Sequence, residues 1–175
     1  SSEVGTLASA GGDAVAVIGY LDQGGKGIIQ GSLDSGAFDT FILSDGMIGD
    51  SLTDTFGKSL NKSFGSLPGS TGKGAGIFSK VAGAAGIDPT GPYTGESYDA
   101  AALIVLAMQA GGSADRDSIA KNVMAVANAP GKKIYPGQLK KALDLLAKGK
   151  AVDYEGATGV IFTDVGEHVG NFLEK

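Results

Sequence analysis

The chain has 175 residues, a comfortable length for one domain and a short one for two. Apolar residues make up 42% of it and charged residues 19%, so it can bury a core and is not a disordered acidic tail. The chain has 14 lysines and arginines and 19 aspartates and glutamates. The resulting net charge of −5 argues against a nucleic-acid surface and against a polybasic membrane anchor.

The first part of the chain has the pattern strand, helix, strand. Residues 14–20 form a short β-branched block between glycine-rich turns, which is typical of a fully buried strand in a parallel sheet. Residues 27–36 predict a short helix that ends at Gly36. A second strand is expected over residues 40–43, and Asp50 is expected to cap the helix that follows. This order predicts a parallel crossover unit.

A connector rich in serine, glycine and lysine spans residues 58–76, with the expected boundary near residues 68–71. Beyond it the pattern is mostly helical. The expected elements are helices over residues 77–85 and 95–111, a helix that starts at Asp115, a last helix with Pro136 at its first position, and a strand and turn over residues 159–169. The helix over 95–111 is apolar almost all round at residues 100–108 and should be buried. Each part has too few strands for a sheet, so we expect the chain to be incomplete.

Several kinds of chemistry are excluded by residues that the chain lacks. Without cysteine it has no disulfide, no thiol nucleophile and no cysteine-ligated metal. Its single histidine, His168, cannot build a multi-histidine metal site and lies in an acidic turn without an evident nucleophile. The longest apolar run, residues 100–108, is shorter than the ~20 residues of a membrane span. We expect no catalytic residue, no metal and no cofactor.

Three short motifs each fail at a defining position. Leu67 stands where a phosphate loop ending at Lys73 needs its first glycine. Gln30 takes the place of the third glycine of a dinucleotide-binding fingerprint. Asp99 stands where a nucleophile elbow around Ser97 needs glycine. A flexible connector, an ordinary turn and a helix start explain these segments better, which disfavours a Rossmann-type enzyme.

Two residues are notable for their position. Tyr20 ends the first predicted strand and Asp45 follows the second. In open α/β sheets, ligands bind beyond the carboxyl ends of parallel strands, so both side chains would lie on one rim. A carboxylate and an aromatic ring face suit a ligand that carries a positive charge. The alternative is a tyrosine that packs on its helix and an aspartate that caps a turn.

An ordered set of segments covering nearly all of the chain resembles the periplasmic substrate-binding proteins of branched-chain amino acid (Leu/Ile/Val) ABC transporters. The segments are residues 13–20, 28–36, 41–46, 96–103, 129–131, 135–137, 139–146, 153–157 and 162–164. The resemblance implies an α/β fold of the type I periplasmic binding protein kind, with three-layer Rossmann-like lobes that are incomplete in this chain. Residues 1–69 would belong to the second, C-terminal lobe, and residues 70–175 would return to the first, N-terminal lobe.

The resemblance also implies ligand contacts. The positions of Tyr20 and Asp45 are ligand contacts in this family, and the acidic group pairs with the ammonium of the amino acid. Gly46 is a further candidate, followed by Leu21 and Tyr98. Asp45 is one methylene shorter than the glutamate of the leucine-binding type.

The function implied by the resemblance is extracytoplasmic solute binding without catalysis. The protein would bind an amino acid, branched-chain or similar, and deliver it to the membrane permease of an ABC transporter in a bacterial periplasm. The missing N-terminal half of the protein would be a partner of this chain, and the signal peptide would lie outside it. An alternative is a ligand-sensing domain of the same fold in a receptor or regulator.

Overall fold

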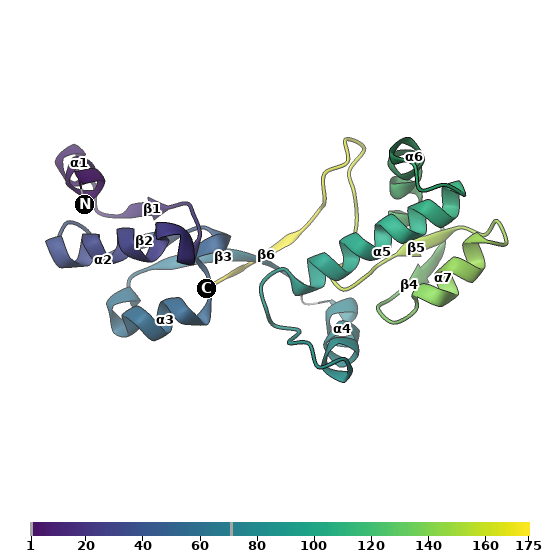
Figure 1. Cartoon of the computed structure of the whole chain (residues 1–175), viewed down its shortest axis with the longest axis horizontal. Helices are drawn as coiled ribbons and strands as arrows, with labels where there is room; N and C mark the ends of the chain where they lie inside the picture. The colour runs from purple at the N-terminus through teal and green to yellow at the C-terminus, as the bar shows by residue number, and fades with distance from the viewer. Residues whose placement is uncertain (1, 71) are drawn as a thin grey trace. The chain divides into compact units, whose positions relative to one another are not determined.

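The computed structural model describes residues 2–70 and 72–175, which form two compact units (Figure 1). Unit 1 comprises Ser1–Pro68 together with Phe172–Lys175, and unit 2 comprises Gly69–Asn171. The end of the chain therefore groups with unit 1, whereas the sequence pattern assigned it to the second part. The assignment of the two units to the lobes of a binding protein stays a prediction.

Unit 1 is built around a four-stranded sheet in the order β1-β2-β3-β6. Its elements are α1 (Ser2–Ala10), β1 (Val15–Val17), α2 (Lys26–Ser35), β2 (Phe41–Leu43), α3 (Asp50–Phe56), β3 (Phe64–Gly69) and β6 (Asn171–Glu174). β1 runs parallel to β2, with Val17 beside Leu43, and β2 runs parallel to β3. Gly65 and Lys175 exchange two backbone hydrogen bonds of 3.0 Å, the pattern of an antiparallel pair, and so join β6 to β3. The predicted parallel crossover is confirmed.

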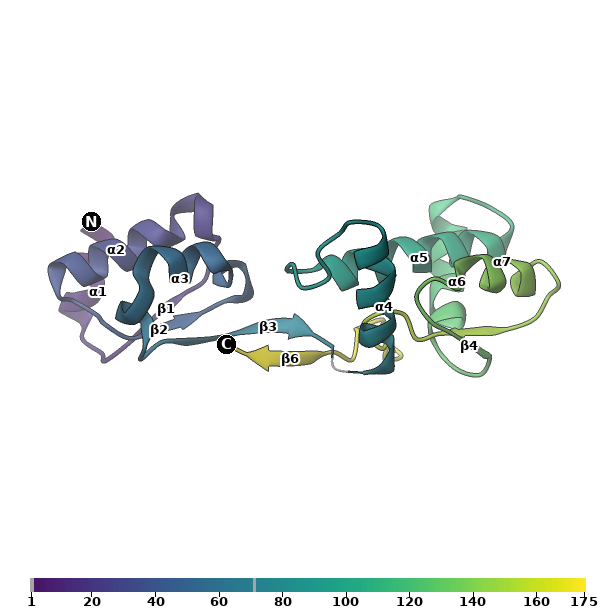
Figure 2. The same ribbon diagram turned by 90° about the horizontal axis from the view of Figure 1, so that it is seen from below.

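The core of unit 1 lies between the sheet and the helices α2 and α3, which cover one face of it (Figure 2). Its buried side chains are Val15, Val17, Ile29, Phe38, Phe41, Leu43, Met47, Leu52 and Phe56. The expectation of a fully buried strand over residues 14–20 is wrong, because β1 has three residues and Ile18 is 87% exposed. Ala16 and Ile42 point away from the core and are exposed, because alternate residues of a strand face opposite ways.

The sequence predicts the end of α2 correctly and the start of α3 incorrectly. α2 ends at Gly36, whose φ of 66° is left-handed and therefore suits glycine, as predicted. Asp50 does not cap α3, because it is the first helical residue and Gly49 precedes it without a side-chain cap. The prediction of a connector over residues 58–76 is also partly wrong, because this segment contains β3. Its glycine, serine and proline residues are poor strand formers, so pairing with β2 overrides local propensity here.

Unit 2 is mostly helical, with a two-stranded parallel sheet. Its elements are α4 (Lys73–Ala84), α5 (Thr94–Gly111), α6 (Arg116–Ala127), β4 (Lys132–Ile134), α7 (Leu139–Leu146) and β5 (Val152–Tyr154). The main core gathers side chains from α5, α6, α7 and both strands. A second, smaller core contains Phe78 and Ala82 of α4 together with Ala157, and Tyr98 packs against it.

Most of the helices expected in unit 2 are present, with three corrections. α5 is not buried all round, since Ile104 is 48% exposed and Val105 is 39% exposed. Pro136 does not start the last helix, because α7 begins three residues later at Leu139. α4 begins at Lys73, earlier than expected. The strand predicted at the start of residues 159–169 is absent, and this segment contains a turn and a single antiparallel bridge between Phe162 and His168. Among the described residues, no helix is long and apolar enough to cross a membrane.

Candidate functional site

The candidate site of unit 1 lies at the carboxyl ends of β1 and β2. Tyr20 and Asp45 each follow one of these adjacent parallel strands, so the sheet brings the two segments to one edge. The backbone joins them directly, because the N–H of Ser44 donates to the Val17 carbonyl at 3.1 Å. The Ser44 hydroxyl accepts the N–H of Gly19 at 3.2 Å and donates to the Gly19 carbonyl at 3.4 Å. Hydrogen bonds between the ends of the two strands therefore hold the backbone next to Tyr20 and Asp45.

Gly46 is a point of close approach between the two segments. A Cβ at Gly46 would overlap the carbonyl oxygen of Gly19 and lie 2.8 Å from Cδ1 of Tyr20. Only glycine fits there, and the ring of Tyr20 lies against it. Tyr20 is nevertheless 61% exposed. The structure thus brings Tyr20 and Gly46 into contact and leaves much of the aromatic ring accessible.

Asp45 starts a short 3₁₀ turn, Asp45–Met47, and its side chain is exposed. Its Oδ1 accepts the N–H of Gly46, the next residue of the turn, at 2.8 Å. None of the ion pairs among the described residues involves Asp45. The carboxylate therefore combines one local hydrogen bond with a negative charge that forms no ion pair among the described residues.

The two further candidates have clear packing roles. Leu21 is half-buried and packs against the core of unit 1. Tyr98 belongs to unit 2, where its hydroxyl accepts the N–H of Gly137 at 2.9 Å. Its ring lies 5.3 Å from the ring of Phe78, centre to centre. A ligand contact by Leu21 or Tyr98 stays a prediction.

Tyr93 is a position that sequence reasoning did not select. Among the described residues it is the one non-glycine with a positive φ, at 60°, and it immediately precedes α5. Strained backbone of this kind gathers at functional sites, which makes Tyr93 a candidate in unit 2. No sequence signal marks it, because tyrosine is not a residue type associated with the left-handed region.

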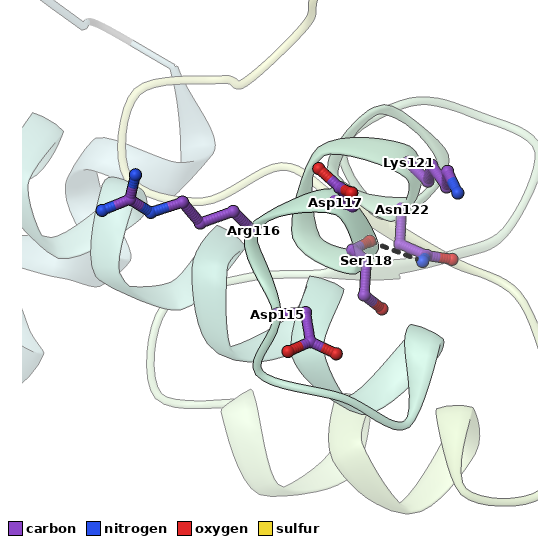
Figure 3. A pocket seen from close by; sticks show the side chains of 6 residues that line it. All are labelled: Asp115, Arg116, Asp117, Ser118, Lys121 and Asn122. Carbon is purple, nitrogen blue, oxygen red and sulfur yellow. Dashed lines mark hydrogen bonds between the residues drawn. The ribbon is translucent and has the colours of Figure 1, made fainter.

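A surface hollow of about 520 Å³ lies at the start of α6 (Figure 3). Its lining side chains are Asp115, Arg116, Asp117, Ser118, Lys121 and Asn122, and that of Arg116 extends away from the others. A Cβ at Gly111 would overlap the Ser118 hydroxyl and lie 2.7 Å from Nδ2 of Asn122. Ser118 and Asn122 thus pack where α5 meets α6, so helix packing explains their position, whereas the other four side chains are exposed.

The fold is that of the type I periplasmic binding proteins, as the resemblance implied. A leucine-binding protein, LivK from Thermotoga maritima, superposes with a TM-score of 0.67 at 17% identity, over 99% of this chain and 43% of that one. A type 1 periplasmic binding protein from Bordetella pertussis Tohama I superposes with a TM-score of 0.55 at 17% identity, over 97% of this chain and 48% of that one.

One curated relative matches part of the chain. It is the chemotactic signal transduction system substrate-binding protein BasB of Halobacterium salinarum, which is 38% identical over 71 residues. These residues make up 41% of this chain and 17% of BasB. No known family profile matches the chain. The chain thus spans less than half the length of these two solved proteins, and its match with BasB covers a smaller share still.

Proposed function

We propose that this chain is part of an extracytoplasmic solute-binding protein whose ligand is an amino acid or a related small zwitterion. The observation that carries the proposal is the edge formed by Tyr20, Asp45 and Gly46 in unit 1. It places an exposed ring and an exposed carboxylate at the carboxyl ends of two adjacent parallel strands. Ligands of open α/β sheets bind at this kind of edge.

The chemistry of this edge suits the ammonium group of a free amino acid. Asp45 would supply a charge-assisted hydrogen bond to it, and the accessible face of Tyr20 would supply a cation–π contact. Gly46 would let the ligand approach the backbone closely, because it carries no side chain. Groups for the ligand carboxylate and side chain would come from elsewhere in the protein.

The whole protein would deliver its ligand to the permease of an ABC transporter. Support comes from the fold, which this chain shares with a leucine-binding protein over 43% of that protein's length. A further polypeptide segment would complete the binding cleft. The protein would lie in the periplasm, a proposal that the same comparison supports. We propose a branched-chain amino acid as the first ligand to test in binding experiments.

The test is ligand affinity in the whole protein after substitution of Asp45. Asp45→Ala should weaken amino-acid binding by about 2–5 kcal/mol, because it leaves the ligand's ammonium without its charged partner. Asp45→Asn should weaken binding by most of the same amount, because it keeps the shape of the side chain and removes its charge. Asp54→Ala is the matched control, because Asp54 is exposed on α3 in the same unit. Unchanged affinity of Asp45→Ala in isothermal titration calorimetry would refute the site.

Ligand sensing is the second candidate function, and the relation to BasB, a chemotaxis protein by name, favours it. Both candidates use the same binding site and differ in the membrane partner. Deletion of the gene followed by two assays separates them. Loss of labelled amino-acid uptake with normal chemotaxis supports transport, and loss of chemotaxis with normal uptake supports sensing.

A further inference from the structure

Asp99 is a buried carboxylate of α5 to which the solute-binding proposal gives no role. It is 3% exposed, and none of the ion pairs among the described residues involves it. A buried charge needs hydrogen bonds in place of water, so its partners show what it holds. They come from β5 and from the turn that follows β5, well over 50 residues further along the chain.

Asp99 accepts hydrogen bonds from four donors. The hydroxyl of Tyr154 donates to Oδ1 at 2.8 Å. The N–H of Ala157 lies 2.8 Å from Oδ1 and 3.0 Å from Oδ2. Thr158 donates both its N–H and its hydroxyl to Oδ2, each at 2.8 Å. One side chain therefore holds two consecutive residues, Ala157 and Thr158, of the turn segment 156–158.

The same turn also holds α4. Gly156 has a φ of 58°, and a Cβ there would overlap Oδ1 of Asp99. On its other side, a Cβ at Gly74 in the first turn of α4 would overlap the carbonyl oxygen of Gly156. Ala157 is buried in the same small core as Phe78 and Ala82 of α4. The turn is thus packed between α5 and α4, and neither glycine leaves room for a larger residue.

We infer that Asp99 is the positioning residue that anchors α4, and with it the entry of the chain into unit 2. The contacts run from the Asp99 carboxylate to the turn 156–158 and from that turn to Gly74. α4 is the first helix after the boundary between Pro68 and Gly69. Asp99 therefore fixes the place where the first of the two connections between the units is attached to unit 2. It would do so whatever ligand the protein binds.

Hydrogen–deuterium exchange, followed peptide by peptide in the whole protein, tests this inference. Asp99→Asn should speed exchange about tenfold both in the turn 156–158 and in residues 75–80 of α4, because an amide cannot accept all four donors. The amides of α6 should keep their wild-type rates. Tyr98→Phe is the control, because it removes a hydroxyl from the neighbouring residue, which binds Gly137 instead. It should leave residues 75–80 unchanged.

Two results would overturn the inference. One is faster exchange in the turn 156–158 without any change in residues 75–80. The other is an equal rise across all of unit 2, which would mean a general loss of stability. If Asp99→Asn does not fold, Thr158→Val removes one of the four donors and should give the same pattern with a smaller rise. A uniform rise in that variant also counts against the inference.

Discussion

Tyr20 offers the most direct test of the ligand chemistry at the residue level. A cation–π contact depends on the ring and not on the hydroxyl, so Tyr20→Phe should keep its affinity for an amino acid. Tyr20→Ala should lose about 0.5–2 kcal/mol in binding, measured by calorimetry. Because Tyr20 is 61% exposed, the thermal midpoints of both variants should stay near that of the wild type. Equal losses in the two variants would mean that the hydroxyl makes the contact.

Tyr154 gives a prediction about stability at high pH. Burial, followed by the nearby charge of Asp99 and the hydrogen bond to it, raises the pKa of Tyr154 far above the usual value near 10. In the unfolded chain Tyr154 loses its proton near pH 10, whereas in the folded chain it keeps the proton. The stabilising contribution is therefore complete below pH 10 and is lost as the pH rises above it.

The matched variant for this prediction is Tyr154→Phe, which cannot ionise. We expect the wild type to lose more free energy of unfolding than Tyr154→Phe between pH 9 and about pH 11, in denaturant titrations at each pH. The lysines and the other tyrosines titrate in both proteins, so their effect cancels in the comparison. Parallel curves for the two proteins would show that Tyr154 has an ordinary pKa.

Two glycine substitutions test how elements are joined. A Cβ at Gly46 would overlap the Gly19 carbonyl and press on the Tyr20 ring, so Gly46→Ala should destabilise unit 1 and weaken ligand binding. Gly27 lies inside α2, where a Cβ would meet nothing within 4 Å. Gly27→Ala should raise the free energy of unfolding by about 0.4–1 kcal/mol. Denaturant unfolding of both variants checks the opposite signs, and stabilisation by Gly46→Ala would show that the two strand ends are not tightly joined.

The elements differ in how far the sequence foretells them. Helices α2, α5 and α6 are predictable, because their apolar residues have helical spacing and glycine or aspartate marks their ends. Strands β4 and β5 have three residues each, as β1 and β2 do, but they contain charged residues and therefore lack the apolar run that marks β1 and β2. β3 is rich in small residues and exists because it pairs with β2 and β6. Its formation depends on residues more than 100 positions away, at the end of the chain.

At the scale of the whole molecule, the uncovered face of the unit 1 sheet is the dominant feature. Ile42, Phe64 and Phe172 are 42%, 48% and 69% exposed on strands of this sheet. They line a hollow of about 430 Å³. Sheets with parallel strands are normally covered on both faces. We therefore predict that an isolated polypeptide of residues 1–175 folds only beside a complementary segment or by association with another copy.

Sedimentation and calorimetry of the isolated polypeptide check this prediction. We expect oligomers and binding of a hydrophobic dye, with no sharp thermal transition of a monomer. The double variant Ile42→Ser with Phe64→Ser should bind less dye, because it makes the uncovered face polar. A monomer with a cooperative thermal transition would contradict the prediction.

The sequence by itself determined the fold class, the parallel crossover and the placement of Tyr20 and Asp45 after two neighbouring strands. These depend on local patterns: a β-branched run, a helix period and a glycine boundary. Only the tertiary structure decided that Gly46 touches Tyr20, that Asp99 holds the turn 156–158, and that the end of the chain returns to unit 1. Those contacts join residues far apart in the chain, and a side chain's distant partner is set by packing and not by its sequence neighbours.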